Sequence, residues 1–166
     1  YGLLALRFGN ADILPYDLES YTVDLTGHID DINERAGRNL FDGTGIMEQI
    51  EEMSAQIALL RSLLDEAVNS GEQNESDLRN INRKLIQLER NFLHSEGLPF
   101  SPWLRSLYAS SDPYSGYASW MLPAYRYAIE EEKLDDEQFM DQLHAAHLAA
   151  FERFSGSLDS IINDLE

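Results

Sequence analysis

Two histidines near the carboxyl end of the chain are the first residues whose type and spacing could do chemistry. His144 and His147 stand three positions apart, a spacing that puts both imidazoles on one face of a helix, where they could share a metal ion. A metal site needs further ligands, and the nearby Asp141 and Glu152 do not complete an HExxH or related motif. The alternative is a pair of structural histidines on the surface of a helix or at the edge of its core. We favour that alternative and expect no metal site in this chain.

Three serines and an acidic run are the other candidates. Ser110, Ser111 and Ser115 would suit a hydrolase only within a strand-turn-helix nucleophile elbow, and the chain has no GxSxG motif. The run EEEKLDDE at 130–137 lacks the alternating oxygen ligands and the glycine turn of a calcium loop. We interpret this run as a solvated junction between helices. Taken alone, the residues form no catalytic constellation.

Helical periodicity dominates the rest of the sequence. Apolar residues recur every three or four positions from Asp17 to about Gly37, over 46–67, over 78–92 and again in the last thirty or so residues. The polar turn at 69–76 joins the second and third of these segments, which predicts an antiparallel helical hairpin. We therefore expect an all-α fold, a helical bundle with four main helices of the up-down type, and a short additional helix that begins at Pro123.

Some positions have specific expected roles. Thr44 is a candidate N-cap for the second helix and Asp135 for the last one. Leu60 lies on the apolar seam of the central hairpin. Residues 11–17 should be extended, because Pro15 disfavours helical geometry at the residue before it.

The segment 97–120 interrupts the periodicity. It reads GLPFSPWLRSLYASSDPYSGYASW and carries three of the five prolines. We expect a long ordered loop, since loops of this length are uncommon in compact domains and are often functional. The side chains that should hold it in place are Phe100, Trp103, Leu107, Tyr108 and Trp120.

Composition limits the classes of function. Thirty acidic and twelve basic side chains give a formal net charge of −18, and such a surface repels phosphate backbones and anionic lipid headgroups. We therefore expect no nucleic-acid binding and no membrane contact by this domain. The chain contains no cysteine, which excludes disulfides and thiolate catalysis. It begins at Tyr1 without an initiator Met, and we interpret it as a piece of a longer protein.

Three stretches together resemble one known family. They are ADILPYDLESY at 11–21, LPAYRYAIEE at 122–131, and a stretch between them that carries Leu88, Glu89, Arg90, Phe92, Gly97, Leu98, Pro99, Pro102, Arg105, Tyr108 and Ala109. In order and spacing they resemble the C-terminal helical dimerisation domain shared by transferrin receptors and the glutamate carboxypeptidase family of zinc exopeptidases. The resemblance extends from about residue 10 to the end of the last helix.

This resemblance implies a division into domains and a set of partners. Residues 1–15 would be the tail end of a preceding protease-like domain, and residues 16–166 would be the helical dimerisation domain. The chain would form a homodimer through its bundle. Zinc and the catalytic residues would belong to the preceding domain, with no cofactor in this chain, and the location would be extracytoplasmic. The parent protein would be either a zinc exopeptidase or a non-catalytic, transferrin-receptor-like protein.

The resemblance also implies a role for the loop. In the peptidases the corresponding segment leans over the active site, where a lysine-tyrosine pair closes on the substrate's terminal glutamate. Tyr114, Ser115 and Gly116 match this tyrosine and its context, whereas Pro113 replaces the lysine, which weakens the case for a terminal glutamate. Tyr114 is thus expected to line a substrate pocket, with its hydroxyl facing a partner domain. In the alternative, Tyr114 and Tyr117 pack on the bundle within an ordinary connector.

A further alternative sets the resemblance aside. The segments 46–67 and 78–92 would then form the binding face of a free-standing helical adaptor for a partner helix.

Overall fold

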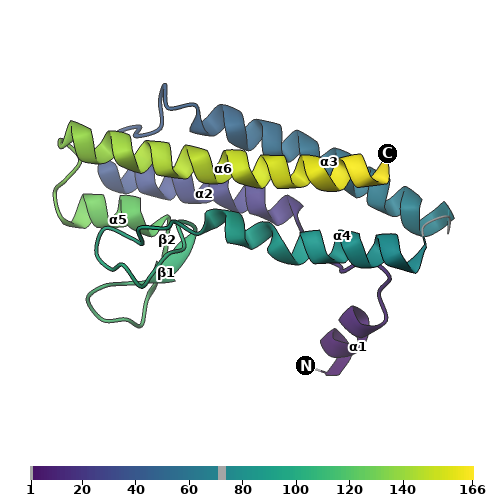
Figure 1. The fold of residues 1–166 in the computed structure, drawn as a ribbon. Coiled ribbons are helices and arrows are strands. Elements are labelled where there is room, and N and C mark those ends of the chain that lie inside the picture. Colours follow the sequence, from purple (N-terminus) through teal and green to yellow (C-terminus); the bar gives the residue numbers. More distant parts are fainter. Residues whose placement is uncertain (1, 71–73) are drawn as a thin grey trace.

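The computed structural model describes residues 2–70 and 74–166, and helices account for most of them. The all-α prediction is confirmed, with a small β hairpin added to it (Figure 1). In chain order the elements are α1 (Gly2–Gly9), α2 (Glu19–Ala36), α3 (Ile46–Ser70), α4 (Glu75–Gln87), the 3₁₀ helix η1 (Leu88–Phe92), β1 (Ala109–Ser111), β2 (Ser119–Met121), α5 (Pro123–Glu130) and α6 (Glu137–Leu165).

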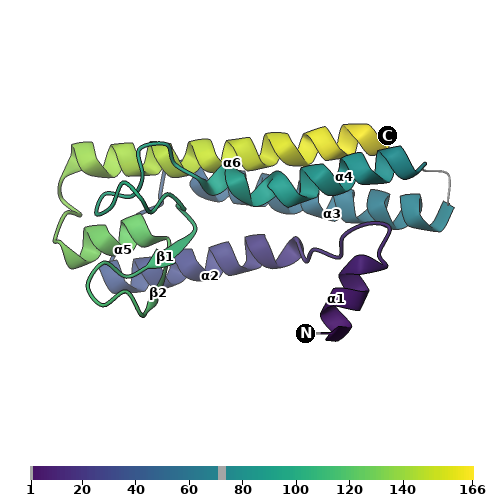
Figure 2. The ribbon, with the colours of Figure 1, turned by 60° about the horizontal axis from the view of Figure 1, so that its bottom comes forward.

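The long helices lie alongside one another in an up-down bundle. Figures 1 and 2 show α2 and α4 running in one direction and α3 and α6 in the other. The most extensive packing is between α6 and α3, and α6 also contacts η1 and α4. The β hairpin and α5 lie toward one end of the bundle, and α1 projects from the opposite end.

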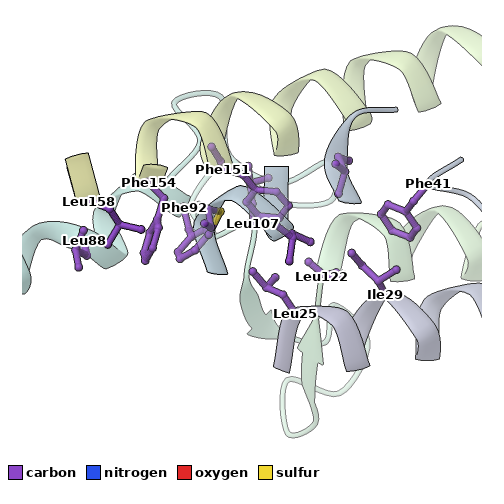
Figure 3. Packing of buried hydrophobic residues seen from close by; sticks show 14 of the residues in the cluster. Leu25, Ile29, Phe41, Leu88, Phe92, Leu107, Leu122, Phe151, Phe154 and Leu158 are labelled. Atoms are coloured by element: carbon purple, nitrogen blue, oxygen red, sulfur yellow. The ribbon is translucent and has the colours of Figure 1, made fainter. Parts of the chain in front are cut away.

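The predicted apolar stripes form the core. Leu60, on the seam of α3, is fully buried, as expected. Figure 3 shows how side chains from α2, η1 and α6 meet in one layer of packing. Its labelled members include Leu25, Ile29, Leu88, Phe92, Phe151, Phe154 and Leu158, each no more than 3% exposed. Burial of an apolar side chain of this size stabilises the fold by roughly 1.5–3 kcal/mol.

The ends of two helices differ in how well they were predicted. Thr44 Oγ1 accepts a hydrogen bond from the Ile46 N–H at 3.3 Å, so it serves the start of α3, although Gly45 rather than Thr44 directly precedes the helix. The prediction for Asp135 is wrong: Asp136 caps α6, and its carboxylate accepts from the Phe139 N–H at 3.1 Å. Asp136 has the extended backbone that an N-cap requires. Asp135 lies one residue farther from the helix and pairs with Arg38 at 3.0 Å.

The helix predicted over 78–92 changes its winding near its end. The α-helical part stops at Gln87, and the following residues form η1. A 3₁₀ turn is common at the carboxyl end of a helix, and here it keeps both Leu88 and Phe92 buried. Part of the predicted turn at 69–76 lies outside the described residues, and α3 extends through Ser70.

The segment 97–120 is more regular than predicted. Strands β1 and β2 pair antiparallel, with Ser110 opposite Trp120. Residues 11–17, predicted to be extended, form no helix or strand and bend at residues 12–13, and Leu14 is held by a 2.8 Å hydrogen bond from its N–H to Asn82 Oδ1. Helix α1 was not predicted. Within the described part of the chain, no helix is long and apolar enough to cross a bilayer.

Candidate functional site

The turn that joins β1 to β2 is organised by one buried carboxylate. Asp112 follows β1 directly, and its oxygens accept hydrogen bonds from the N–H groups of Tyr114, Ser115 and Ala118 at 3.0, 2.5 and 2.9 Å. The Ser115 hydroxyl donates to the same carboxylate at 2.6 Å. An Asp side chain that accepts from backbone N–H groups two and three residues ahead forms an Asx-type turn. Asp112 therefore fixes the backbone on which Tyr114 stands.

These hydrogen bonds also determine the ionisation of Asp112. The Ser115 hydroxyl contributes most, followed by the backbone N–H groups, and together they hold the pKa of the Asp112 carboxyl well below its usual range. Donors that converge on a carboxylate stabilise its charged form. The turn is therefore built around a permanent negative charge at neutral pH.

Tyr114 leaves this turn and reaches across to the end of α5. Its ring meets Trp120 edge-to-face, with centroids 5.8 Å apart, and its hydroxyl donates to Glu131 Oε1 at 2.7 Å. This hydrogen bond raises the pKa of Tyr114 to about 12. The side chain is 62% exposed. The hydroxyl was expected to face a partner domain; in the structure it already has a hydrogen-bond acceptor within the chain.

The other predicted loop residues lie beside Tyr114. Ser115 serves the turn, since its hydroxyl is bonded to Asp112. Gly116 adopts a left-handed backbone with φ of 72°, which suits glycine in a turn. Tyr117 is 96% exposed. The alternative in which Tyr117 packs on the bundle is therefore wrong for that residue.

Aromatic side chains from three segments support the hairpin. Phe100 lies 6.1 Å from Trp120 and 5.3 Å from Tyr127, centroid to centroid, and the Arg126 guanidinium lies over the Trp120 ring at 5.6 Å. These contacts anchor the hairpin to α5, as predicted for Phe100 and Trp120. The prediction fails for Trp103, which is 89% exposed and holds nothing in place.

The histidine pair has a structural environment. His147 is buried, and its Nδ1 lies 2.8 Å from the carbonyl oxygen of Leu143, so that the ring donates there. Its ring centroid is 4.6 Å from that of Tyr125, and His144 lies against the same tyrosine at 5.6 Å. Burial lowers the pKa of His147 to about 4 and also lowers that of His144. Both rings are therefore neutral at pH 7, His147 within the core and His144 at its edge.

The acidic run and the serines show no sign of catalysis either. Glu130 pairs with Arg126 at 2.6 Å, and Asp136 serves as the cap of α6. The Ser110 hydroxyl donates to the carbonyl oxygen of Ser111 at 3.1 Å, so it is not bonded to a base. No group of three or more His, Asp or Glu side chains that could hold a metal ion occurs among the residues that the structure describes.

Two residues of this site were missed by sequence reasoning. Asp112 could have been found from the turn chemistry of DPYS, in which an Asp precedes small and turn-forming residues. Glu131 carried no such signal, because it sits 17 residues after Tyr114 within a run of glutamates. The Tyr114–Glu131 contact depends on how the hairpin packs against α5.

Comparison with known proteins adds an independent finding. Residues 42–155 match the family model described as transferrin receptor-like dimerisation domain. The chain is 30% identical over 133 residues to a probable glutamate carboxypeptidase from Arabidopsis thaliana. This alignment covers 80% of this chain and 19% of that protein. It is 31% identical over 130 residues to a probable glutamate carboxypeptidase from Zea mays, covering 72% and 17% respectively. The chain thus spans about a fifth of the length of these curated relatives.

Proposed function

This chain belongs to the transferrin receptor-like dimerisation domain family, and from that premise we propose that it joins two copies of its parent protein and lends its β hairpin to a peptidase active site. The family match extends from the residues before α3 to the middle of α6. The named relatives are probable glutamate carboxypeptidases. In this proposal the parent is a zinc-dependent exopeptidase, and zinc is held by a preceding catalytic domain rather than by this chain.

The observation that carries the pocket role is the fixed, outward position of the hairpin. Asp112 holds the turn by four hydrogen bonds, yet Tyr114 and Tyr117 remain largely exposed on it. A rigid loop that presents aromatic groups to solvent is typical of a segment that completes a site on a neighbouring domain. We propose that Tyr114, Ser115 and Gly116 line the substrate pocket, with Tyr114 making the contact.

The amino-terminal arm supports the division into domains. Helix α1 projects away from the bundle (Figure 2), and Leu3 and Leu6 on it are exposed. The exposure of these two leucines is explained if α1 packs against the preceding protease-like domain, to whose tail end we assign residues 1–15. An extracytoplasmic location is the part of this proposal that follows from the resemblance alone.

The structure does not favour the adaptor alternative. That alternative needs the apolar stripes of 46–67 and 78–92 to be free for a partner helix. Instead, Ile57 and Leu60 of α3 and Leu85 of α4 are buried within the chain's own core, and α6 packs against both helices. A partner helix would have to displace α6.

The parent protein tests the proposal through its mass and its activity. Light scattering over a range of concentrations should give twice the chain mass for the parent, and deletion of residues 16–166 should give the mass of a monomer. A parent that stays monomeric at every concentration would contradict the dimerising role. A dimer without peptidase activity would instead identify a non-catalytic, receptor-like parent.

A further inference from the structure

Glu131 changes what the Tyr114 hydroxyl can offer to a ligand. A phenol has one proton to donate and lone pairs that accept. In this chain the proton is donated to Glu131 Oε1 at 2.7 Å. Toward a third group the phenol oxygen is left with its acceptor capacity, and the carboxylate beside it is an acceptor as well. The pair therefore suits a ligand that brings hydrogen-bond donors.

The negative charge of Glu131 is not neutralised locally. None of the ion pairs among the described residues includes Glu131. The nearby cation Arg126 is held by Glu130 at 2.6 Å and lies over Trp120, and Lys133 lies over the Phe139 ring at 5.5 Å. Pro113, immediately before Tyr114, brings no charge. A carboxylate approaching Tyr114 would meet uncompensated like charge.

The fold holds the backbone of both members of the pair, and the hydrogen bond between them orients the two side chains. Tyr114 stands on the turn fixed by Asp112, and its ring rests against Trp120. Glu131 caps α5, where its N–H donates to the carbonyl oxygen of Tyr127 at 3.0 Å. A site whose acceptors are already positioned spends little free energy on ordering when a ligand binds.

From this geometry we infer that Glu131 sets the charge preference of the pocket, so that Tyr114 and Glu131 together receive a cationic substrate side chain, an ammonium or guanidinium group, and select against an acidic one. This inference rests on the proposed role of Tyr114 in a peptidase pocket. A cation placed between a phenol oxygen and a carboxylate gains charge-assisted hydrogen bonds, whereas an acidic side chain would have to break the Tyr114–Glu131 bond first.

The test compares two peptides on the parent protein with its catalytic domain. The peptides are identical except for a terminal Arg or Glu, and kcat/KM is measured for each. We expect the unmodified protein to prefer Arg. Glu131→Gln should lower kcat/KM for the Arg peptide about ten- to a hundredfold, the range of one hydrogen bond between charged groups, and should leave or raise that for the Glu peptide. Glu132→Gln, at an adjacent exposed position, is the matched control and should preserve the ratio.

Tyr114→Phe separates the failure of this inference from failure of the proposed function. Suppose that Tyr114→Phe lowers kcat/KM on the peptides, while Glu131→Gln leaves the Arg-to-Glu ratio of kcat/KM unchanged, even if it lowers both values. The inferred charge preference is then wrong and the pocket role stands. If neither variant changes the activity on either peptide, or the parent has no peptidase activity, both are wrong. A thermal melt of each variant should match that of the unmodified protein, which keeps a loss of folding from imitating a change in preference.

Discussion

Gly97 and Pro102 lie in direct backbone contact at the start of the segment that carries the hairpin. A Cβ atom built on Gly97 would sit 2.5 Å from the Cα of Pro102, and Gly97 has a φ of 81°. Contact with backbone cannot be relieved by turning a side chain, and a left-handed φ is strained for any residue with a Cβ. The close packing at Gly97 is thus available to glycine alone.

We predict that Gly97→Ala lowers the free energy of unfolding by at least about 2 kcal/mol, the sum of backbone strain and steric conflict. Gly27→Ala is the matched control, because Gly27 lies in α2 with nothing within 4 Å of an added Cβ. That substitution should stabilise by about 0.5–1 kcal/mol. Urea denaturation measures both, and equal midpoints would contradict the contact.

The register of α3 is tested by two adjacent leucines. Leu60 is fully buried, whereas Leu59 is about half exposed. Leu60→Asp should therefore destabilise the domain by about 4 kcal/mol or more, because it buries an unpaired charge. Leu59→Asp should cost less, about 1–2 kcal/mol, because it loses only partial burial and some helix propensity. Similar melting temperatures for the two variants would show that the assigned face of α3 is wrong.

The Asp112 turn makes a prediction about acid. The pKa of Asp112 is lowered in the folded state. The contribution of Asp112 to stability is therefore complete above the pKa of aspartate in the unfolded chain, about 3.9, and declines as the pH falls below that value. Asp112→Asn should remove that part of the pH dependence and speed amide exchange at Ser115 and Ala118, whose N–H groups lose a charged acceptor. Asp42→Asn, at an exposed position, is the control. Unchanged exchange at these two amides would contradict the role of Asp112.

Buried His147 makes a second prediction about pH. Its pKa is lowered to about 4 in the folded state, so the unfolded chain takes up a proton first as the pH falls. The contribution of His147 to stability is complete above the pKa of histidine in the unfolded chain, about 6.5. It declines between that pH and pH 4, by about 3 kcal/mol at most. His147→Gln should flatten the unfolding free energy over this interval. His144→Gln should flatten it less, because His144 is only partly buried. Parallel slopes in all three proteins would contradict the buried, neutral assignment of His147.

The helices could be predicted because their signal is local. The stripe of Ile50, Met53, Ile57 and Leu60 is visible at spacings of three and four, and the same residues are buried in the structure. The hairpin could not be predicted in this way, since strands of three residues are too short to show alternation and their pairing joins residues such as Ser110 and Trp120 across the loop. The same limit applies to Trp103, whose size favours burial but whose position leaves it exposed.

In the candidate site, too, one part could be predicted from the sequence and another part depends on packing. Tyr114 was found through resemblance to a family, and its exposure is compatible with that role. Its hydrogen bond to Glu131 was not foreseen, because it depends on the packing of the hairpin against the end of α5. A sequence pattern can identify a residue such as Tyr114 as functional, but it does not show which acceptor its hydroxyl bonds to in the folded chain.

The most direct test of the proposed pocket role is deuterium uptake by residues 112–118 in the parent protein, measured with and without an inhibitor bound at the peptidase active site that we propose for it. The turn should exchange more slowly when the inhibitor is bound, because Tyr114 and its neighbours would be covered by the ligand they help to hold. The bundle helices, including α3, should be unaffected and serve as the internal control. If the inhibitor protects the catalytic domain while residues 112–118 exchange at the same rate, the hairpin takes no part in the active site.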